Sequence, residues 1–512
     1  MTKNIKRRPP TLVLLLAVFA LLVALTPLVY LWVRLGEFGI DKVLAQMLRP
    51  RTIELLGNSL LLAASVGLTA LLLGSIQAWV SIRSSLKLRV LFGVTAALPL
   101  AIPSYVSAYT YTALFPGFSG FWSAWLLLSI GTAPYVYLAV SAALLRSDPA
   151  TEEVARTLGA KPWRVIREVT WPSIRPAAVA GALIASLYAL SDFGAVSILR
   201  YDTFTRAIYN AYRSSFDRSA AASLAGVLIL VTLLILFVEA KARGGYQSAG
   251  GNYRKAVPVG LGRWALGPNL LLGTWLILAL VIPAFSLVRW SIIGSSSADL
   301  GEIIRALLNS IGYAVSGGLV TTGFAVAIGI LTVRYQSRWS SIFGRLVWLT
   351  HAMPGIVVAL ALVFLSNRLL PGIYQTNLIL LIAYLALYLP NALSAVSTPL
   401  SQAPKSLDEV AQSLGASRLS VLRKVVLPIA GPGILLATLL VTLTVLKELP
   451  ATLMLRPTGI ETLATRLWSE TSVGAFSAAA PYALLLVLVA GIPAWLLNRQ
   501  IRSTLRQELE RE

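Results

Sequence analysis

Cysteine is absent from this 512-residue chain, and histidine occurs only once. The first absence excludes disulfides, thiolate metal sites and thiol nucleophiles. The second excludes the H-E-x-x-H zinc motif, which needs two histidines. No G-x-x-x-x-G-K-[ST] sequence occurs either, so the chain has no P-loop for nucleotide phosphates. These absences indicate a protein that is not an enzyme, and any ATP hydrolysis would have to occur on another polypeptide.

Charged residues are also scarce. They make up 12% of the chain, against roughly 25% in soluble domains. Hydrophobic residues make up 57%, and the mean hydropathy is +0.76. About 20 consecutive apolar residues cross a bilayer core, and the sequence holds twelve such runs. The prediction is an all-α polytopic membrane protein. The twelve predicted spans are residues 11–33, 57–81, 90–115, 121–145, 175–198, 221–240, 268–290, 307–333, 342–366, 375–399, 430–455 and 475–498.

The few charges present are mostly positive, with 43 Lys and Arg against 21 Asp and Glu. In a soluble protein a net charge of +22 would suggest a nucleic-acid partner. In a membrane protein it places basic loops in the cytoplasm and near lipid. With the N-terminus inside, the inner segments carry 29 Lys and Arg and the outer loops carry 14. This bias predicts that both termini are cytoplasmic and that nucleic acid is not a partner. The long first apolar run lacks a clear cleavage site and is expected to be a retained span.

The chain contains an internal repeat. "LSDFGAVSILR" at 190–200 resembles "LKELPATLMLR" at 446–456, an offset of 256 residues, and Asn58 resembles Asn309 at an offset of 251. Six spans per repeat give two halves of the same orientation, related by an axis along the membrane normal. A pathway between the halves would lie near that axis. The predicted segments are 1–56 (N-terminal segment, first span and outer loop), 57–240 (first domain), 241–267 (basic Gly-rich linker), 268–306 (seventh span and outer loop), 307–498 (second domain) and 499–512 (tail).

One charged phrase is repeated as well: "EEVARTLGA" at 152–160 and "DEVAQSLGA" at 408–416. We call residues 148–172 the first repeat loop and residues 404–428 the second repeat loop. Each is expected to form two short amphipathic helices hinged at a glycine. Asp148 before a proline predicts the first helix start, and Ser406 with Glu409 predicts a capping box in the second.

Amphipathic helices of this kind can lie on the membrane surface with their basic residues near lipid phosphates. In both loops, however, the glycine is followed by proline 13 and 17 residues later. Lipid contact requires no such matching, whereas a protein partner with two equivalent sockets does. The exchanges between the copies, Glu152 for Asp408 and Arg156 for Gln412, suggest that the two sockets need not be loaded identically.

The pattern Glu-x-Ala-x-x-x-Gly with these prolines resembles the EAA loop of ABC-importer permeases. The matching residues are Glu153, Ala155 and Gly159, then Glu409, Ala411 and Gly415; Val154 and Val410 depart from the family's middle alanine. The resemblance implies the type I permease fold. It also implies that these residues couple the chain to a cytoplasmic ABC ATPase dimer. That partner would bind ATP and Mg, and this chain itself would bind no cofactor.

The stretches 190–212 and 447–468, which begin inside the fifth and eleventh spans, resemble the fused permeases of ferric-iron importers, and this resemblance covers about residues 57–498. It implies a bacterial cytoplasmic (inner) membrane protein that receives ferric iron from an extracytoplasmic, periplasmic binding protein. Permeases for thiamine, polyamines and inorganic anions remain alternatives. A twelve-span secondary transporter is a further rival. It would need a coupling-ion site near the midplane and has no use for duplicated loops.

Asp192 and Glu448 are equivalent ionisable residues inside spans, which makes them candidates for the substrate pathway. A hard Fe³⁺ ion prefers oxygen ligands. The alternative is a pair of hydrated interfacial carboxylates, with Glu448 beside Lys447. No certain metal site is predicted. His351 is expected to be a packing residue. Tyrosines are expected to form an aromatic belt more often than a ligand set; those considered are Tyr105, Tyr109, Tyr111, Tyr201, Tyr209 and Tyr212.

Overall fold

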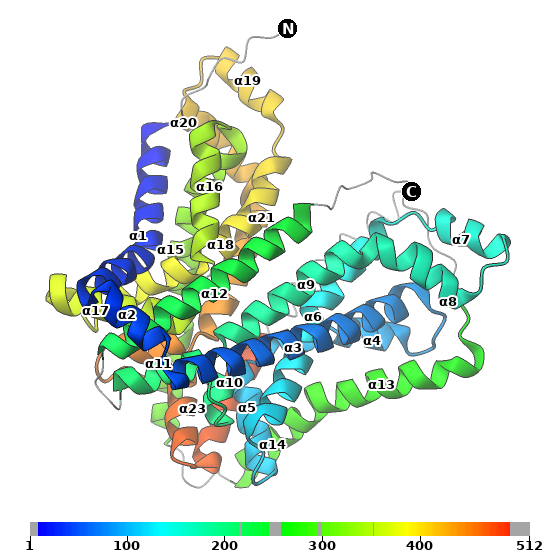
Figure 1. Ribbon diagram of the computed structural model, residues 1–512. Coiled ribbons are helices and arrows are strands. Elements are labelled where there is room, and N and C mark those ends of the chain that lie inside the picture. Colours follow the sequence, from blue (N-terminus) through cyan, green and yellow to red (C-terminus); the bar gives the residue numbers. More distant parts are fainter. Residues whose placement is uncertain (1–8, 214–217, 245–257, 294–298, 352, 492–512) are drawn as a thin grey trace. The chain divides into compact units, whose positions relative to one another are not determined.

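A computed structural model describes residues 9–213, 218–244, 258–293, 299–351 and 353–491 (Figure 1). Within these ranges the chain is helical, and the only β-type pairing is an isolated bridge between Ser84 and Val259. This confirms the predicted all-α fold class. The bridge joins the end of the basic linker to the turn after α3 (Pro50–Arg83) through two backbone hydrogen bonds, of 2.7 and 3.0 Å.

Nine of the described helices are long and apolar enough to cross a membrane, and two further helix pairs qualify only if each bent pair counts as one span. The predicted spans 90–115 and 342–366 are therefore not continuous helices: the first pair bends by 95° and the second by 99°. Pro103 and Pro354 stand at the two bends in extended conformation. Proline has no backbone N–H and cannot continue the preceding helix. The last predicted span is described as the helix Phe476–Gly491.

The described chain separates into two compact units. Unit 2 comprises residues between 44 and 293 together with 474–480. Its centre is formed by α3, α6 and α9, which pack side by side (Figure 1). A Cβ at Gly74 of α3 would lie 2.6 Å from the carbonyl oxygen of Ala133 on α6, so glycine is required for this close approach. The elements of unit 2 that follow α3 are α4 (Arg89–Thr95), η1 (Leu98–Ala101), α5 (Ser104–Leu114), α6 (Gly120–Arg146), α7 (Ala150–Thr157), α8 (Pro162–Val165), η2 (Ile166–Thr170), α9 (Trp171–Ser191), α10 (Gly194–Ile198), α11 (Phe204–Arg213), α12 (Arg218–Gly244), η3 (Gly262–Ala265), α13 (Leu266–Leu276), η4 (Ile277–Val281) and α14 (Ile282–Ile293).

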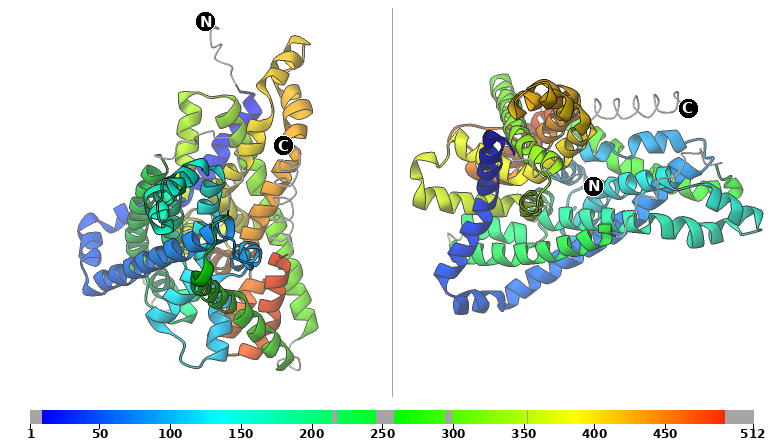
Figure 2. Two further views of the ribbon diagram at one scale, coloured as in Figure 1. Left: turned by 90° about the vertical axis from the view of Figure 1, so that its right-hand side faces the viewer. Right: turned by 90° about the horizontal axis from the view of Figure 1, so that it is seen from above.

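Unit 1 comprises residues 9–43, 299–473 and 481–491 of the described chain. Its centre repeats that of unit 2, with α15, α18 and α21 in mutual contact. Figure 2 shows α19 and α20, coloured yellow-orange, at one end of these helices. The elements are α1 (Thr11–Phe38), α15 (Leu300–Arg334), α16 (Arg338–Thr350), α17 (Gly355–Leu369), η5 (Pro371–Ile373), α18 (Asn377–Gln402), α19 (Lys405–Ser413), α20 (Arg418–Val421), η6 (Leu422–Val426), α21 (Leu427–Leu446), α22 (Pro450–Leu455) and α23 (Leu463–Ser472), while α2 (Ile40–Met47) crosses the boundary between the units.

The first span of each half packs with the other half of the sequence. In unit 1, α1 contacts α15, α17 and α18, and the Tyr30 hydroxyl donates to the carbonyl of Phe364 at 3.1 Å. In unit 2, α14 contacts α5, and the Ser286 hydroxyl donates to the carbonyl of Thr110 at 2.8 Å. Positions 30 and 286 are 256 residues apart, the offset of the repeat. The repeat therefore includes the first span of each half, which the predicted domains 57–240 and 307–498 leave outside.

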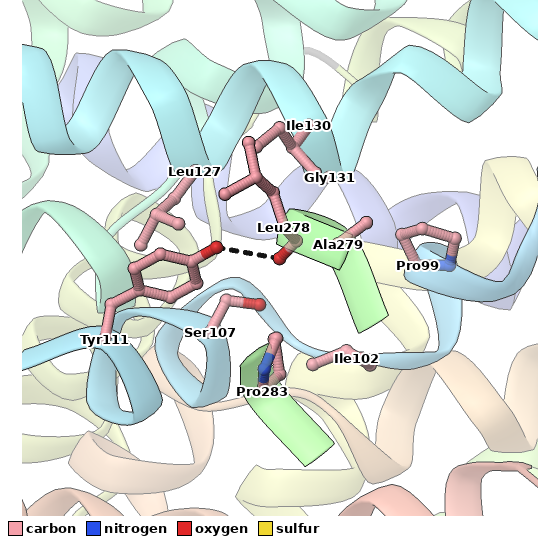
Figure 3. A pocket seen from close by; sticks show the side chains of 10 residues that line it. All are labelled: Pro99, Ile102, Ser107, Tyr111, Leu127, Ile130, Gly131, Leu278, Ala279 and Pro283. Atoms are coloured by element: carbon pink, nitrogen blue, oxygen red, sulfur yellow. Dashed lines mark hydrogen bonds between the residues drawn. The ribbon is translucent and has the colours of Figure 1, made fainter. Parts of the chain in front are cut away.

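A second contact holds the seventh span in unit 2. The Tyr111 hydroxyl donates to the carbonyl of Leu278 at 2.8 Å, at the edge of a small and mostly apolar pocket (Figure 3). Leu278 lies in the π-helical turn η4, and a π-helical bond to its carbonyl would come from residue 283. Residue 283 is proline and has no N–H to donate. The tyrosine thus satisfies a carbonyl that the helix itself leaves unpaired.

Candidate functional site

The two repeat loops have the same local structure. Helix α7 ends at Thr157 and helix α19 ends at Ser413, and the glycine two residues beyond each end, Gly159 or Gly415, has φ of +84°. The amide of Gly159 donates to the carbonyl of Arg156, and the amide of Ala160 donates to that of Ala155. The same pair of bonds recurs 256 residues later, at 3.0 Å each. This is the Schellman arrangement, in which a glycine in the left-handed region closes the helix.

The helix starts differ between the loops. Asp148 accepts a hydrogen bond from the amide of Ala150 at 2.9 Å, so the predicted start of the first helix is confirmed. The predicted capping box in the second loop is wrong. Helix α19 already begins at Lys405, preceded by Pro404, and no side chain caps it. Proline presets the backbone before the first turn, so the helix starts one residue ahead of Ser406.

The repeat loops present apolar side chains at their surface. Leu158 and Leu414 are each 82% exposed, and Val154 and Val410 are each 56% exposed. Of the predicted coupling residues, Glu153, Ala155 and Ala411 are half-buried, whereas Glu409, Gly159 and Gly415 are exposed. Isolated apolar residues on a surface mean little, but a matched pair on each of two helix ends is typical of a contact surface.

Two acidic residues of the repeat loops face inward. Glu152 is buried, and its side chain accepts a hydrogen bond from Thr170 at 3.0 Å. Asp408, its equivalent, accepts one from Arg334 at 3.1 Å. The sequence interpretation assigned the exchange of Glu152 for Asp408 to different sockets; the structure instead directs both carboxylates toward the ends of spans. The sequence contained one sign of this arrangement: the arginines that end α3 and α15 are 251 residues apart, an offset of the repeat.

Asp192 and Glu448 each follow a span and precede a short helix. Asp192 accepts hydrogen bonds from the amides of Ala195 and Val196 at 2.9 and 3.2 Å and from the Ser104 hydroxyl. Glu448 is arranged likewise, with the amides of the residues three and four positions later at 2.9 and 2.8 Å. Both side chains are 7% exposed. They therefore cap α10 and α22 at the breaks in the predicted spans 175–198 and 430–455, and they are not hydrated interfacial groups.

An Asn-Ser pair near the start of α3 and of α15 holds the segment that follows each break. The Asn58 amide donates to the carbonyl of Asp202 at 3.1 Å, and the Asn309 amide donates to that of Glu461 at 2.9 Å. The adjacent serine hydroxyls, Ser59 and Ser310, accept from the first amides of α11 and α23 at 3.1 and 2.7 Å. These residues marked the repeat in the sequence, and their shared structural task explains why they recur.

Three of the tyrosines considered above are buried. Tyr105, Tyr109 and Tyr111 are at most 4% exposed, so they do not form an interfacial belt. The Tyr109 hydroxyl donates to the carbonyl of Phe476 at 2.7 Å within unit 2. His351 packs edge-to-face against Trp348 with ring centroids 5.7 Å apart, as expected of a packing residue. Among the described residues no group of three or more His, Asp or Glu side chains is placed to hold a metal ion.

Two units built on one helical plan, each carrying a matched loop with an exposed apolar tip, define a duplicated membrane permease with several spans in each half. Sequence comparison identifies the family. Residues 70–241 and 319–503 each match the model for the binding-protein-dependent transport system inner membrane component. The two matches cover more than half of the chain, and the chain belongs to this family.

Individual relatives agree with that family. The chain is 37% identical over 501 residues to the "Fe(3+)-transport system permease protein FbpB 2" of Haemophilus influenzae, covering 96% of this chain and 99% of the relative. It is 23% identical to the "Ferric transport system permease protein FbpB" of Actinobacillus pleuropneumoniae, over 89% of this chain and 72% of that protein. It is also 29% identical to the "Sulfate transport system permease protein CysT" of Escherichia coli, over 43% of this chain and 86% of that protein.

Proposed function

We propose that this permease carries ferric iron across the cytoplasmic membrane. The single observation that supports the substrate is the full-length likeness to a ferric-iron permease, since the sulfate permease matches less than half of the chain. The substrate would arrive on an extracytoplasmic binding protein, a route supported by the family's description as part of a binding-protein-dependent transport system. Iron is cargo here, and the permease would need only to let it pass.

Energy would come from a partner ATPase dimer that binds ATP and Mg. Its two equivalent grooves would receive the tips of the first and second repeat loops. Leu158 and Leu414 would enter the apolar part of each groove, and burial of a leucine side chain contributes about 1.5–3 kcal/mol. Closure of the dimer on ATP would move both loops and thereby shift each unit between outward-open and inward-open states.

This arrangement requires the repeat loops to lie in the cytoplasm. The charge bias of the sequence supports that orientation, with both termini on the same side as the loops. The extracytoplasmic side would then hold α11 and α23, the segments tied down by Asn58 and Asn309. A binding protein approaching from that side would meet these two segments.

Reconstitution tests the proposal. Proteoliposomes that hold the permease with its ATPase should accumulate radioactive iron only when ATP is inside and iron-loaded binding protein is outside. The matched control replaces the iron-loaded protein with its iron-free form. Stimulated uptake of sulfate, thiamine or a polyamine in place of iron would contradict the substrate, and uptake driven by an ion gradient without ATP would contradict the energy source.

A further inference from the structure

A buried arginine ends α3 and joins three elements of unit 2. The Arg83 side chain is 4% exposed, and its guanidinium donates to the carbonyl of Leu144 at 3.1 Å and to the hydroxyl of Ser147 at 2.7 Å. Its Nε lies 3.5 Å from Glu152 Oε1. The end of α3, the end of α6 and the repeat-loop helix α7 therefore meet at one guanidinium group.

The same junction exists in unit 1. The Arg334 side chain, also 4% exposed, ends α15 and donates to the carbonyls of Leu400 and Ala403 at 3.3 and 2.8 Å. Its Nε donates to Asp408 Oδ2 at 3.1 Å, and a second guanidinium nitrogen contacts the other carboxylate oxygen. Such two-point contact is the strong geometry for an arginine and a carboxylate.

The two junctions fall at the offsets of the repeat. Arg83 and Arg334 differ by 251 residues, as Asn58 and Asn309 do, and Glu152 and Asp408 differ by 256. The carbonyl acceptors Leu144 and Leu400 also differ by 256. Each unit builds the junction from its own residues. The structure therefore shows the same arrangement of side chains twice.

The repeat-loop helices also pack on the first turns of the span that follows each of them, Trp163–Ser191 and Arg418–Leu446. The elements that contact α7 most are α8 and η2, its own neighbours in sequence, and α19 is arranged likewise with α20 and η6. A pocket lined by Arg146, Thr151, Glu152 and Ser173 opens beside α7. Neither α3 nor α15 is among the elements that contact these helices most, so the arginine is the main attachment of each helix to the span that ends in it.

We propose that Arg83 with Glu152, and Arg334 with Asp408, are positioning pairs that transmit movement of the repeat-loop helices to α3 and α15. The proposal rests on the proposed function, because a repeat-loop helix moves only if an ATPase moves it. Neither pair touches substrate. Each pair attaches its repeat-loop helix to α3 or α15 as well as to the following span, so displacement of the loop tip becomes displacement of α3 or α15.

The two pairs differ in how far the position of the carboxylate depends on its arginine. Glu152 is also held by Thr170 at 3.0 Å and by Arg156 at 3.2 Å. The positions equivalent to these two helpers in the second repeat loop are occupied by Val426 and Gln412. Asp408 therefore depends more on its arginine, and we expect substitutions in the second pair to have the larger effect.

Hydrogen exchange tests the attachment on the permease alone. Arg334→Gln should speed amide exchange in α19 by about tenfold or more, because a charged hydrogen bond to its carboxylate is lost. Arg83→Gln should have a smaller effect on α7. The control is Arg305→Gln, on the same helix as Arg334, which removes an exposed pair with Asp299 at 3.8 Å. Unchanged exchange in α19 of the Arg334→Gln protein would overturn the proposal.

Transport tests the transmission in the reconstituted complex. Asp408→Asn leaves Arg334 bonded to two carbonyls and serves if Arg334→Gln fails to fold. It should lower uptake per ATP hydrolysed by about tenfold while the ATPase stays bound and active, a loss within the usual range of coupling energies. Asp408→Glu, which restores the charge, should recover most of the uptake. Unchanged uptake per ATP in Asp408→Asn, or no recovery in Asp408→Glu, would contradict the proposal. Exchange requires neither iron nor ATPase, so a wrong substrate assignment leaves the first test intact.

Discussion

Asp192 and Glu448 are the residues whose interpretation the structure changes most. The sequence singled them out because they are ionisable and repeated, and the structure shows that each one caps a short helix after a break in a span. A capping carboxylate retains some unused acceptor capacity, so a place in the substrate pathway remains a prediction for both. The two tasks respond differently to substitution.

Substitution by the amide and by alanine separates these tasks. Asp192→Ala and Glu448→Ala remove the cap, and each should cost about 0.5–2 kcal/mol of stability. Asp192→Asn and Glu448→Gln keep an acceptor oxygen and should unfold close to the wild-type temperature. If the carboxylates guide a cation, the double amide variant should lose most iron uptake despite normal stability. Thermal unfolding and uptake are measured on the same preparations, and normal uptake in the double amide variant would remove both residues from the pathway.

Helix ends carry information that hydropathy does not. The apolar runs located the helices, but an apolar run indicates only that a segment lies in lipid. It does not show where a helix changes direction. The breaks at Pro103 and Pro354, and those capped by Asp192 and Glu448, were therefore not resolved as bends. Repeated glycines were more informative: the sequence predicted hinges at Gly159 and Gly415, and the structure places both in the left-handed region.

The hinge glycines supply a prediction about one helical turn. Alanine at Gly159 or Gly415 meets no atom within 4 Å, so its cost comes only from the positive φ, about 1–2 kcal/mol. We expect weaker binding of the ATPase, because the loop tip would have to leave this geometry. Gly57→Ala is the matched control: it also meets no atom, lies within α3, and should be neutral or slightly stabilising. Co-purification of the ATPase with each variant gives the answer, and equal recovery from all three would show that the turn is not needed.

At the scale of the whole chain, the first span of each half of the sequence belongs to the unit formed mainly by the other half. Helix α1 buries Ala17, Ala20, Ala24 and Leu31 within unit 1, although it is covalently joined to the first half of the sequence. Helices α13 and α14 make the reverse crossing into unit 2. Each half therefore lacks one span of its own unit, and neither half is a complete folding unit.

Splitting the chain tests that arrangement. Cells that express residues 1–250 and 251–512 as separate fragments should yield a complex that co-purifies, because each fragment supplies a span that the other requires. Each fragment expressed alone should be degraded or unfold at lower temperature than the pair. The cut lies in the basic linker and preserves six spans, and hence orientation, on each side. Two fragments that are stable alone and fail to associate would contradict the exchange.

The amino-acid sequence alone determined the class of this protein. Composition and apolar runs decide that a chain enters the bilayer, basic residues decide which loops stay inside, and a repeat at offsets of 251 and 256 reveals the two halves. The tertiary structure alone decided which residues meet. The pairing of Arg83 with Glu152, the crossing of α1 into unit 1 and the bends at Pro103 and Pro354 join or redirect distant segments. Periodicity records how each segment meets its solvent, whereas these contacts depend on packing between segments that the local pattern does not encode.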